Sequence, residues 1–235
     1  MAKSKSNSKA APAKKGVAKQ SSATKAAPKK PAKPSTKPAM TNKSAPAKTG
    51  AKPTTKSATT AADKLSKLYP IDPNQTSALD LGCGTAPRNS FNAQVIVGVD
   101  LQSSDNVLAL DLVTDSLPFA DHSFDFVTAF DVLQTIPRIL YNPERRMPFI
   151  ELMNEIFRVL KPGGLFLSVT PIYPKEGAFR DPGHVNFITP ETFSLYFDRG
   201  NNWAASYGFK GGFLIESQEA SGPHHLVSNL RKPAD

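Results

Sequence analysis

The stretch Ala78-Leu79-Asp80-Leu81-Gly82-Cys83-Gly84-Thr85 decides the fold. A short apolar run gives way here to a turn that contains Gly82 and Gly84. Glycine adopts positive φ without strain and lets a ligand come close to the backbone. In open parallel sheets, ligands bind where such turns leave the carboxyl ends of the strands. The stretch therefore predicts a strand followed by a ligand-binding turn.

Further apolar runs follow, and turn-forming or acidic residues separate them. They are Gln94–Val99, Val107–Leu110, Phe124–Phe130, Leu165–Val169, Phe213–Ser217 and Leu226–Leu230. Continuous apolar runs of this kind are typical of parallel strands that are buried on both faces. The connection 83–93 is short for a full crossover helix, so we expect only a small helix there.

Two segments have the pattern of helices. Between Pro143 and Leu160, apolar residues recur every three or four positions, and Pro162 with the glycines after it ends the pattern. Thr189 followed by Pro190 predicts an N-cap and a short helix through Phe197. Strands that alternate with helices in this way indicate an α/β fold.

The turn after the first strand does not fit a dinucleotide. A pyrophosphate-binding loop requires a third glycine near position 87, where this chain has Ala86 and Pro87. Asp100, at the end of the second predicted strand, lies 18 residues (100 − 82) after Gly82. A carboxylate there can accept hydrogen bonds from both hydroxyls of a ribose. The pattern favours a site for an uncharged nucleoside.

Several motifs in sequence order resemble those of class I S-adenosylmethionine-dependent methyltransferases. They are D-L-G-C-G-T at 80–85, G-V-D-L at 98–101, L-A-L-D-L at 108–112, L-P-F with D-H-S-F-D at 117–125, and E-I-F-R-V-L-K-P-G-G at 155–164. The resemblance covers roughly residues 77–231. It implies a three-layer Rossmann-like α/β fold. Its mostly parallel seven-stranded sheet would have the order 3-2-1-4-5-7-6 and one antiparallel strand, the last.

The resemblance also implies roles for individual residues around S-adenosyl-L-methionine. Asp80, Gly82 and Gly84 would shape the pocket for its methionine part, and Asp100 would hold the ribose. The remaining implied contacts are Asp111 with the adenine amino group, the Leu112 backbone beside the adenine ring, and Phe130 with Asp131 at the sulfonium end. Asp111 would equally well cap a turn.

Residues beyond the cofactor motifs bear on the acceptor. Many relatives have Glu-His where this chain has Gln134 and Thr135. The pattern D-P-G-H-V-N at 181–186 resembles small-molecule methyltransferases of the methyltransferase-11 type, and His184 is the candidate base. A structural hydrogen-bonding role for His184 is the alternative. Cys83 is expected to fill space rather than act as a nucleophile, and no role is expected for His225.

The first 62 residues differ in composition from the rest. They contain fifteen lysines and no acidic residue, so the net charge of +9 leaves −6 (9 − 15) for residues 63–235. Segments so poor in apolar residues do not fold alone, and the Lys/Ala/Pro pattern resembles histone-like tails. We therefore expect a disordered basic tail, 1–62, and a methyltransferase domain, 63–235. The tail is suited to non-specific nucleic acid binding but has no aromatic residue for base stacking.

Composition also limits the cellular setting. A single cysteine, Cys83, excludes an internal disulfide framework and a cysteine-cluster metal site, and no metal is expected. No apolar stretch is long enough to span a bilayer, and the N-terminus lacks the apolar core of a secretory signal. We expect no membrane contact and a cytoplasmic location, with a nucleoid or nucleus as alternatives that the tail allows.

Together these features predict methyl transfer from S-adenosyl-L-methionine to a small-molecule O- or N-acceptor, such as a glycan or a metabolite. Two alternatives stay open. One is a methyltransferase of nucleic acid or protein that the basic tail recruits. The other is a non-catalytic nucleic-acid-binding protein with a degenerate methyltransferase body, for which Thr135 is the main support.

Overall fold

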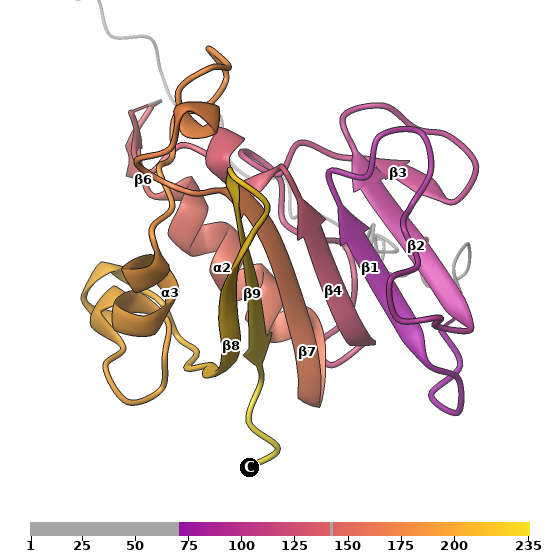
Figure 1. The fold of residues 1–235 in the computed structure, drawn as a ribbon. Coiled ribbons are helices and arrows are strands. Elements are labelled where there is room, and N and C mark those ends of the chain that lie inside the picture. The colour runs from indigo at the N-terminus through magenta and orange to yellow at the C-terminus, as the bar shows by residue number, and fades with distance from the viewer. Residues whose placement is uncertain (1–70, 142) are drawn as a thin grey trace, which may run out of the picture. The chain divides into compact units, whose positions relative to one another are not determined.

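The computed structural model describes residues 71–141 and 143–235, shown in colour in Figure 1. The predicted tail, 1–62, and the first residues of the predicted 63–235 domain lie outside the described residues.

A seven-stranded sheet forms the centre of this part of the chain. Its strands are β1 (Ser77–Leu81), β2 (Val95–Asp100), β3 (Val107–Ala109), β4 (Phe124–Phe130), β7 (Leu160–Pro171), β8 (Leu214–Ser221) and β9 (His225–Arg231). They lie in the order β3-β2-β1-β4-β7-β9-β8. Neighbours from β3 to β7 pair in parallel, and β9 is antiparallel to both β7 and β8. The predicted strand order and the antiparallel last strand are both confirmed.

Helix α2 (Pro148–Val159) packs against β7 and lies behind the sheet in Figure 1. The predicted helix began at Pro143, but residues there form a small hairpin of β5 (Leu140–Tyr141) and β6 (Arg145–Arg146). Helical backbone is disfavoured at the residue before a proline, and Met147, which precedes Pro148, has φ −126° and ψ 76°. Pro148 therefore fixes the first turn of the helix, in the position that suits a proline.

The remaining helical elements are short. α3 (Pro190–Tyr196) begins after Thr189, as predicted, and the Thr189 N–H donates to Thr192 Oγ1 at 2.9 Å. Three 3-10 turns complete the described chain: η1 (Leu133–Thr135), η2 (Glu176–Ala178) and η3 (Trp203–Tyr207). α3 contacts edge strand β8, and Phe197 at its end packs edge-to-face on Phe149 of α2.

The core lies between α2 and the sheet. Residues that alternate along β1, β2 and β4 point toward it and are fully buried, among them Leu79, Val97 and Val127. In parallel strands with matched register, such positions stack in rows, and Leu79 pairs with Val97 on one side and Val127 on the other. This packing fixes the strand ends that carry the site.

The connection from β1 to β2 contains no helix, so the expected small helix at 83–93 is not found. Instead Asn89 closes a loop, since its side chain donates to Ala93 O at 2.9 Å and accepts from Ala93 N at 2.8 Å. Phe91 stacks on Phe126 of β4 with ring centroids 4.4 Å apart. Pro87 and the short connection leave too little chain for a helical crossover.

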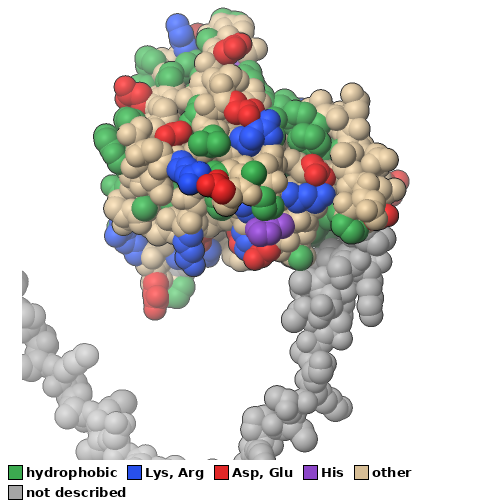
Figure 2. Space-filling model, turned by 90° about the horizontal axis from the view of Figure 1, so that it is seen from below, with side chains coloured by type: hydrophobic (Ala, Val, Ile, Leu, Met, Phe, Trp, Pro, Cys, Tyr) green, Lys and Arg blue, Asp and Glu red, His purple; other side chains and the backbone are tan. Residues whose placement is uncertain are grey.

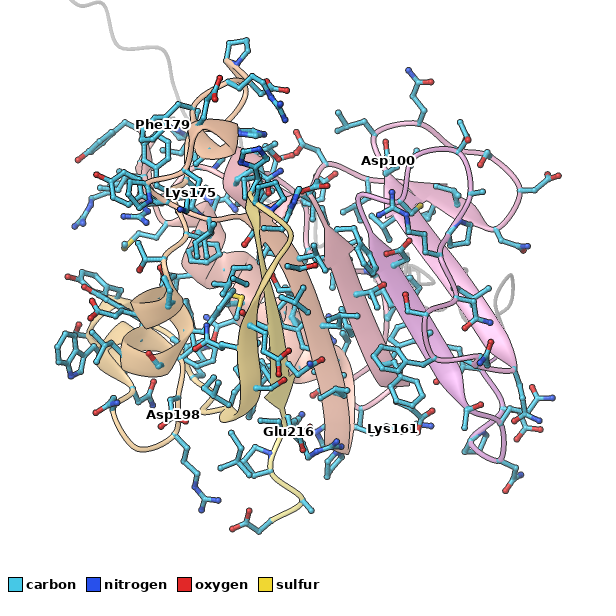
Figure 3. All side chains as sticks on the ribbon, in the orientation of Figure 1. Asp100, Lys161, Lys175, Phe179, Asp198 and Glu216 are labelled. Carbon is cyan, nitrogen blue, oxygen red and sulfur yellow. The ribbon has the colours of Figure 1, made fainter. Side chains whose placement is uncertain are left out.

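The sheet has one edge at the carboxyl ends of its parallel strands and another at their amino ends, and these two edges carry different residues. Asp100 lies near the carboxyl ends of the parallel strands, as do Lys175 and Phe179, whereas Lys161 and Glu216 lie at the opposite edge (Figure 3). That opposite edge shows acidic and basic side chains side by side (Figure 2). Several of them pair, as Lys161 does with Asp125 at 2.8 Å. The candidate site therefore lies at the carboxyl edge.

Candidate functional site at the carboxyl edge of the sheet

The turn after β1 has the backbone that its glycines predict. Gly82 and Gly84 have φ of +62° and +67°. A side chain on Gly82 would place its Cβ 2.6 Å from Val132 Cγ2, whereas a Cβ on Gly84 would meet no atom within 4 Å. Gly82 thus packs against the segment after β4, and Gly84 leaves open space beside the backbone. This open side is where a ligand can approach the turn.

Asp100 ends β2 directly beside this turn, as predicted. Its Oδ2 accepts a hydrogen bond from the Gly84 N–H at 2.9 Å, and its Oδ1 accepts from the Leu101 N–H at 2.8 Å. Each carboxylate oxygen can accept more than one hydrogen bond, so both keep capacity for a ligand hydroxyl. The carboxylate is held in place before any ligand arrives.

Asp80 lies beneath the turn, with 1% of its surface exposed. It accepts hydrogen bonds from Thr128 Oγ1 at 2.6 Å and from the Arg88 N–H at 2.8 Å. Burial raises the pKa of this carboxyl, and the hydrogen bonds oppose that rise. Because its partners come from β4 and from the loop, Asp80 fixes the path of residues 84–88.

Burial also controls the reactivity of the one thiol at the turn, that of Cys83. The pKa of Cys83 is raised to about 11, first by burial and then by the charges of Asp80 and Asp100. A thiol of this kind stays protonated near neutral pH and is a poor nucleophile. Cys83 also lies so close to Gly98 that any side chain at position 98 would collide with its Sγ.

The end of β4 carries a pair that the sequence did not predict. Asp131 has φ +54°, and its Oδ1 lies 3.0 Å from Nε2 of His225 at the start of β9. Pro171 of β7 pairs with His225, and Val169 O accepts from the Asp131 N–H at 2.9 Å. β7 therefore lies between the two residues and brings them to one edge. Nothing in the local sequence of His225 signals this contact.

Asp111 lies at the same edge, because the Leu110 N–H donates to Asp100 O at 2.8 Å. Its Oδ1 accepts from the Val113 N–H at 2.8 Å, which is the turn-capping contact considered as its alternative role. The Leu112 side chain is buried in the core, so its backbone is the part that remains for contact with a ligand. Arg88 places its guanidinium 4.8 Å from the centre of the Phe130 ring.

His184 lies on the segment that is hydrogen-bonded to η1. The Val185 and Asn186 N–H groups both donate to Gln134 O at 2.9 Å, which anchors the segment. His184 Nδ1 is buried and has no hydrogen-bond partner among the described residues. Thr135, which stands where many relatives have histidine, donates its hydroxyl to Val132 O at 2.7 Å.

Within 71–141 and 143–235, no group of three or more His, Cys, Asp or Glu side chains is placed to hold a metal ion. Over the same residues, no helix is both long and apolar enough to cross a membrane.

Parts of this chain are similar to known proteins. Residues 55–204 match the model of a methyltransferase domain family. The demethylmenaquinone methyltransferase of Listeria monocytogenes serotype 4a (strain HCC23) is 28% identical over 119 residues, which are 42% of this chain and 46% of that enzyme. The chain thus matches about half the length of this curated relative.

Two solved structures are similar to parts of this chain. The [4+2]-cyclase SpnF is 19% identical, with a TM-score of 0.49 over 74% of this chain and 80% of that chain. The 1,6-didemethyltoxoflavin-N1-methyltransferase of Burkholderia thailandensis, solved with bound 1,6-didemethyltoxoflavin and S-adenosylhomocysteine, is 16% identical. Its TM-score is 0.45 over 74% of this chain and 78% of that chain.

The glycine turn, the carboxylate at the end of β2 and the strand order agree with the family match, which covers more than half of the chain. This chain belongs to the methyltransferase domain family, within the class I S-adenosylmethionine-dependent methyltransferases.

Proposed function

We propose that this protein transfers a methyl group from S-adenosyl-L-methionine to a small-molecule acceptor, through an oxygen or a nitrogen. One observation carries the proposal. The open backbone at Gly84 lies in the turn after β1, the carboxylate of Asp100 ends β2, and a hydrogen bond of 2.9 Å joins them at the carboxyl edge. An approachable backbone beside a fixed carboxylate suits the amino acid and ribose parts of the cofactor.

Different residues at this edge would contact different parts of the cofactor. Gly82 and Gly84 would hold the methionine part, above Asp80, and Asp100 would accept from the ribose hydroxyls. Asp111 would accept from the adenine amino group through Oδ2, since Oδ1 already binds Val113. The remaining proposed contacts are the Leu112 backbone beside the adenine ring and Phe130 with Asp131 at the sulfonium end.

The cofactor supplies a methyl carbon that its positive sulfur has already activated. The protein's part is to align the acceptor with that carbon and to keep water away, so positioning dominates the rate. A hydroxyl or protonated amine acceptor also needs a group that takes its proton.

Two histidines are candidates for the group that accepts this proton. His184 was expected from the sequence, but its Nδ1 is buried and no carboxylate pairs with it in the described part of the chain. His225 is paired with Asp131, and 36% of its side chain is exposed. A carboxylate partner fixes the orientation of the imidazole ring. We therefore place His225 ahead of His184 as the proton acceptor, with Asp131 as its positioning residue.

Charge favours a small molecule over a polyanion as the acceptor. Residues 63–235 carry a net charge of −6 (9 − 15), which repels nucleic acid from the domain that holds the site. The segment over the carboxyl edge also carries a cluster of Tyr173, Phe179 and Phe187 with ring centroids 5.0 to 5.9 Å apart. Such a cluster provides apolar contact area for a compact acceptor. The name of the Listeria relative also points to a small-molecule acceptor.

The basic tail, 1–62, supports the second candidate, a nucleic acid or protein acceptor recruited by its fifteen lysines. A non-catalytic role in nucleic acid binding would use the same lysines. We propose that the tail and the domain 63–235 are separate units, and that the protein is cytoplasmic unless the tail directs it to a nucleoid or nucleus.

The test uses the full chain with methyl-labelled S-adenosylmethionine. It is offered in parallel to a panel of hydroxyl and amine small molecules, to DNA, to RNA and to lysine-rich protein. Label in a small molecule supports the proposal, and label only in a macromolecule supports the second candidate. If calorimetry shows that the folded chain does not bind S-adenosylhomocysteine, the proposal is wrong.

A further inference from the structure

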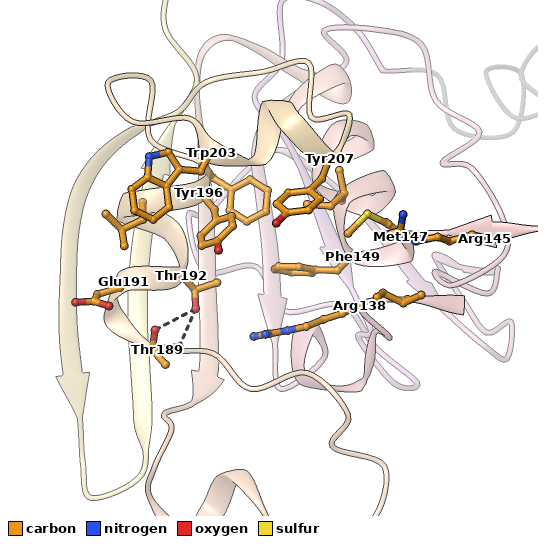
Figure 4. A pocket seen from close by; sticks show the side chains of 14 residues that line it. Arg138, Arg145, Met147, Phe149, Thr189, Glu191, Thr192, Tyr196, Trp203 and Tyr207 are labelled. Atoms are coloured by element: carbon orange, nitrogen blue, oxygen red, sulfur yellow. Dashed lines mark hydrogen bonds between the residues drawn. The ribbon is translucent and has the colours of Figure 1, made fainter. Parts of the chain in front are cut away.

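A pocket of about 700 Å³ lies between α2, α3, η3 and the segment that leads to α2 (Figure 4). Its lining includes Arg138, Arg145, Tyr196, Trp203 and Tyr207. None of the residues proposed to hold the cofactor lines it. A ligand in this pocket would therefore be a second ligand, bound beside the cofactor site rather than in it.

Three aromatic side chains form one wall of the pocket. The Tyr196 ring meets Trp203 edge-on at 5.8 Å and stacks with Tyr207 at 6.3 Å. Trp203 is 52% exposed and Tyr207 is 47% exposed. Large aromatic residues that gather at the surface around a concave space are typical of ligand sites, because a flat apolar ligand buries area that water otherwise covers.

Arg138 supplies an uncompensated positive charge at the opposite wall. Its Nε donates to Asn186 Oδ1 at 2.6 Å, and its Nη2 donates to Phe187 O. Both acceptors are neutral, and three of the five guanidinium hydrogens remain for another partner. Arg138 forms no ion pair with any described residue.

Arg145 adds a second positive charge at one end. It is exposed, and its side chain has no hydrogen bond or ion pair within the described ranges, whereas its neighbour Arg146 pairs with Glu151 at 2.5 Å. The acidic residue of the lining, Glu191, lies at the other end of the pocket from Arg145 (Figure 4). Arg138 and Arg145 both line the pocket, and neither forms an ion pair with a described residue.

We propose that this pocket binds a small aromatic anion, with its ring against Tyr207 and Trp203 and its carboxylate or sulfonate on Arg138, while Arg145 adds positive charge at one end of the pocket. A guanidinium that two neutral acceptors hold still is pre-organised, so binding an anion orders few further atoms. Arg138 also holds the segment 186–187, which follows His184 at the carboxyl edge. The Arg138 side chain therefore contacts both the pocket and that segment.

Trp203 is the only tryptophan of the chain, so its single indole N–H resonance reports on the pocket. The experiment titrates the ¹⁵N-labelled full chain with 2-naphthoate and with the uncharged 2-naphthamide, and follows this resonance. We expect a saturable shift with naphthoate and at least about tenfold weaker binding of naphthamide, because a carboxylate on arginine adds charge-assisted hydrogen bonds. Equal affinities for the two compounds would overturn the proposal, as would no shift with naphthoate.

Variants show which arginine supplies the charge that binds the carboxylate of naphthoate. Arg138→Gln should weaken the binding of naphthoate but not of naphthamide. Arg145→Gln, which removes no side-chain hydrogen bond or ion pair of the described residues, should do the same to a smaller degree. Arg180→Gln is the matched control, because Arg180 is an exposed arginine outside the pocket. If Arg180→Gln weakens naphthoate as much as Arg145→Gln does, the binding follows net charge and the proposal fails.

A titration in saturating S-adenosylhomocysteine separates this site from the proposed cofactor site. The Trp203 shift should saturate at the same naphthoate concentration as without it. Competition between the two compounds would place naphthoate in the cofactor site and overturn the inference. A chain that binds naphthoate in this way but never binds S-adenosylhomocysteine would retain the pocket and lose only the proposed function.

Discussion

His225 Nε2 lies 3.0 Å from Asp131 Oδ1, although 94 positions separate the two residues in the sequence. The antiparallel pairing of β9 on β7 creates this contact at the carboxyl edge. The edge also carries the glycine turn and Asp100, so the pair lies among the residues proposed to hold the cofactor and the acceptor.

The first prediction concerns this pair. His225→Gln should lower kcat by about 100-fold on an acceptor that loses a proton, since removal of a general base typically has this effect. His184→Gln should lower kcat much less. The measurement is the rate of S-adenosylhomocysteine release, and S-adenosylhomocysteine affinity, measured by calorimetry, should be unchanged in both variants. A larger loss in His184→Gln would return the role to His184.

Asp100 is the subject of the second prediction. Asp100→Ala should weaken S-adenosylhomocysteine by about 10- to 100-fold, because hydrogen bonds to a charged group contribute about 1.5–3 kcal/mol. Loss of the carboxylate also frees the Gly84 N–H that it holds at 2.9 Å. Asp105→Ala is the control, since Asp105 is exposed in the next connection. Calorimetric titration of both variants tests this, and similar affinities would argue against a role for Asp100.

The third prediction tests the contact between the turn and β2. Gly98→Ala should destabilise the fold by about 1–3 kcal/mol, because the added Cβ collides with Cys83 Sγ. Cys83→Ala removes the sulfur, so Gly98→Ala should be less destabilising in that background. A double-mutant cycle of urea unfolding measures the difference. An additive result would mean that the turn relaxes freely around Cys83.

Cys83 also gives a chemical prediction. Its pKa of about 11 means that the thiolate is rare at neutral pH, so alkylation by iodoacetamide should be slow and should accelerate up to about pH 11. Asp100→Asn removes one of the charges that raise this pKa and should increase the rate near pH 8, whereas Asp105→Asn should not. The single cysteine makes mass spectrometry a direct readout. Fast alkylation of the wild type at neutral pH would contradict the environment described for Cys83.

Sequence reasoning succeeded where a feature depends on local chemistry. Gly82 and Gly84 require positive φ, and the two residues have it; Asp100 had to end β2, and it does. The strand order came from the family resemblance and is confirmed.

Features that depend on long-range packing were missed. His225 reaches Asp131 only through the register of β7 and β9, which its own neighbours in sequence do not encode. The pocket at Arg138 needs α3 and η3 to lie beside α2, and the β5–β6 hairpin replaces a helical start that periodicity alone favoured.

The last prediction concerns the opposite edge, where Asp125 joins three strands. Its Oδ2 accepts from the Ser77 N–H and from Lys161 Nζ, both at 2.8 Å. Burial tends to raise the pKa of Asp125, but these hydrogen bonds outweigh it and hold the pKa below its usual value. Folding therefore favours the ionised carboxylate. The resulting stability is complete above the unfolded pKa of about 3.9 and is lost as the pH falls through the lower folded value.

Asp125→Asn should accordingly lower the free energy of unfolding by about 1–3 kcal/mol at pH 7, with the difference shrinking as the pH approaches 3. Glu219→Gln is the control, since Glu219 is exposed on β8 and should change stability little at either pH. Urea unfolding of the three proteins between pH 7 and pH 3 gives the comparison. A difference that stays constant over this range would mean that the Asp125 side chain contributes through its shape rather than its charge.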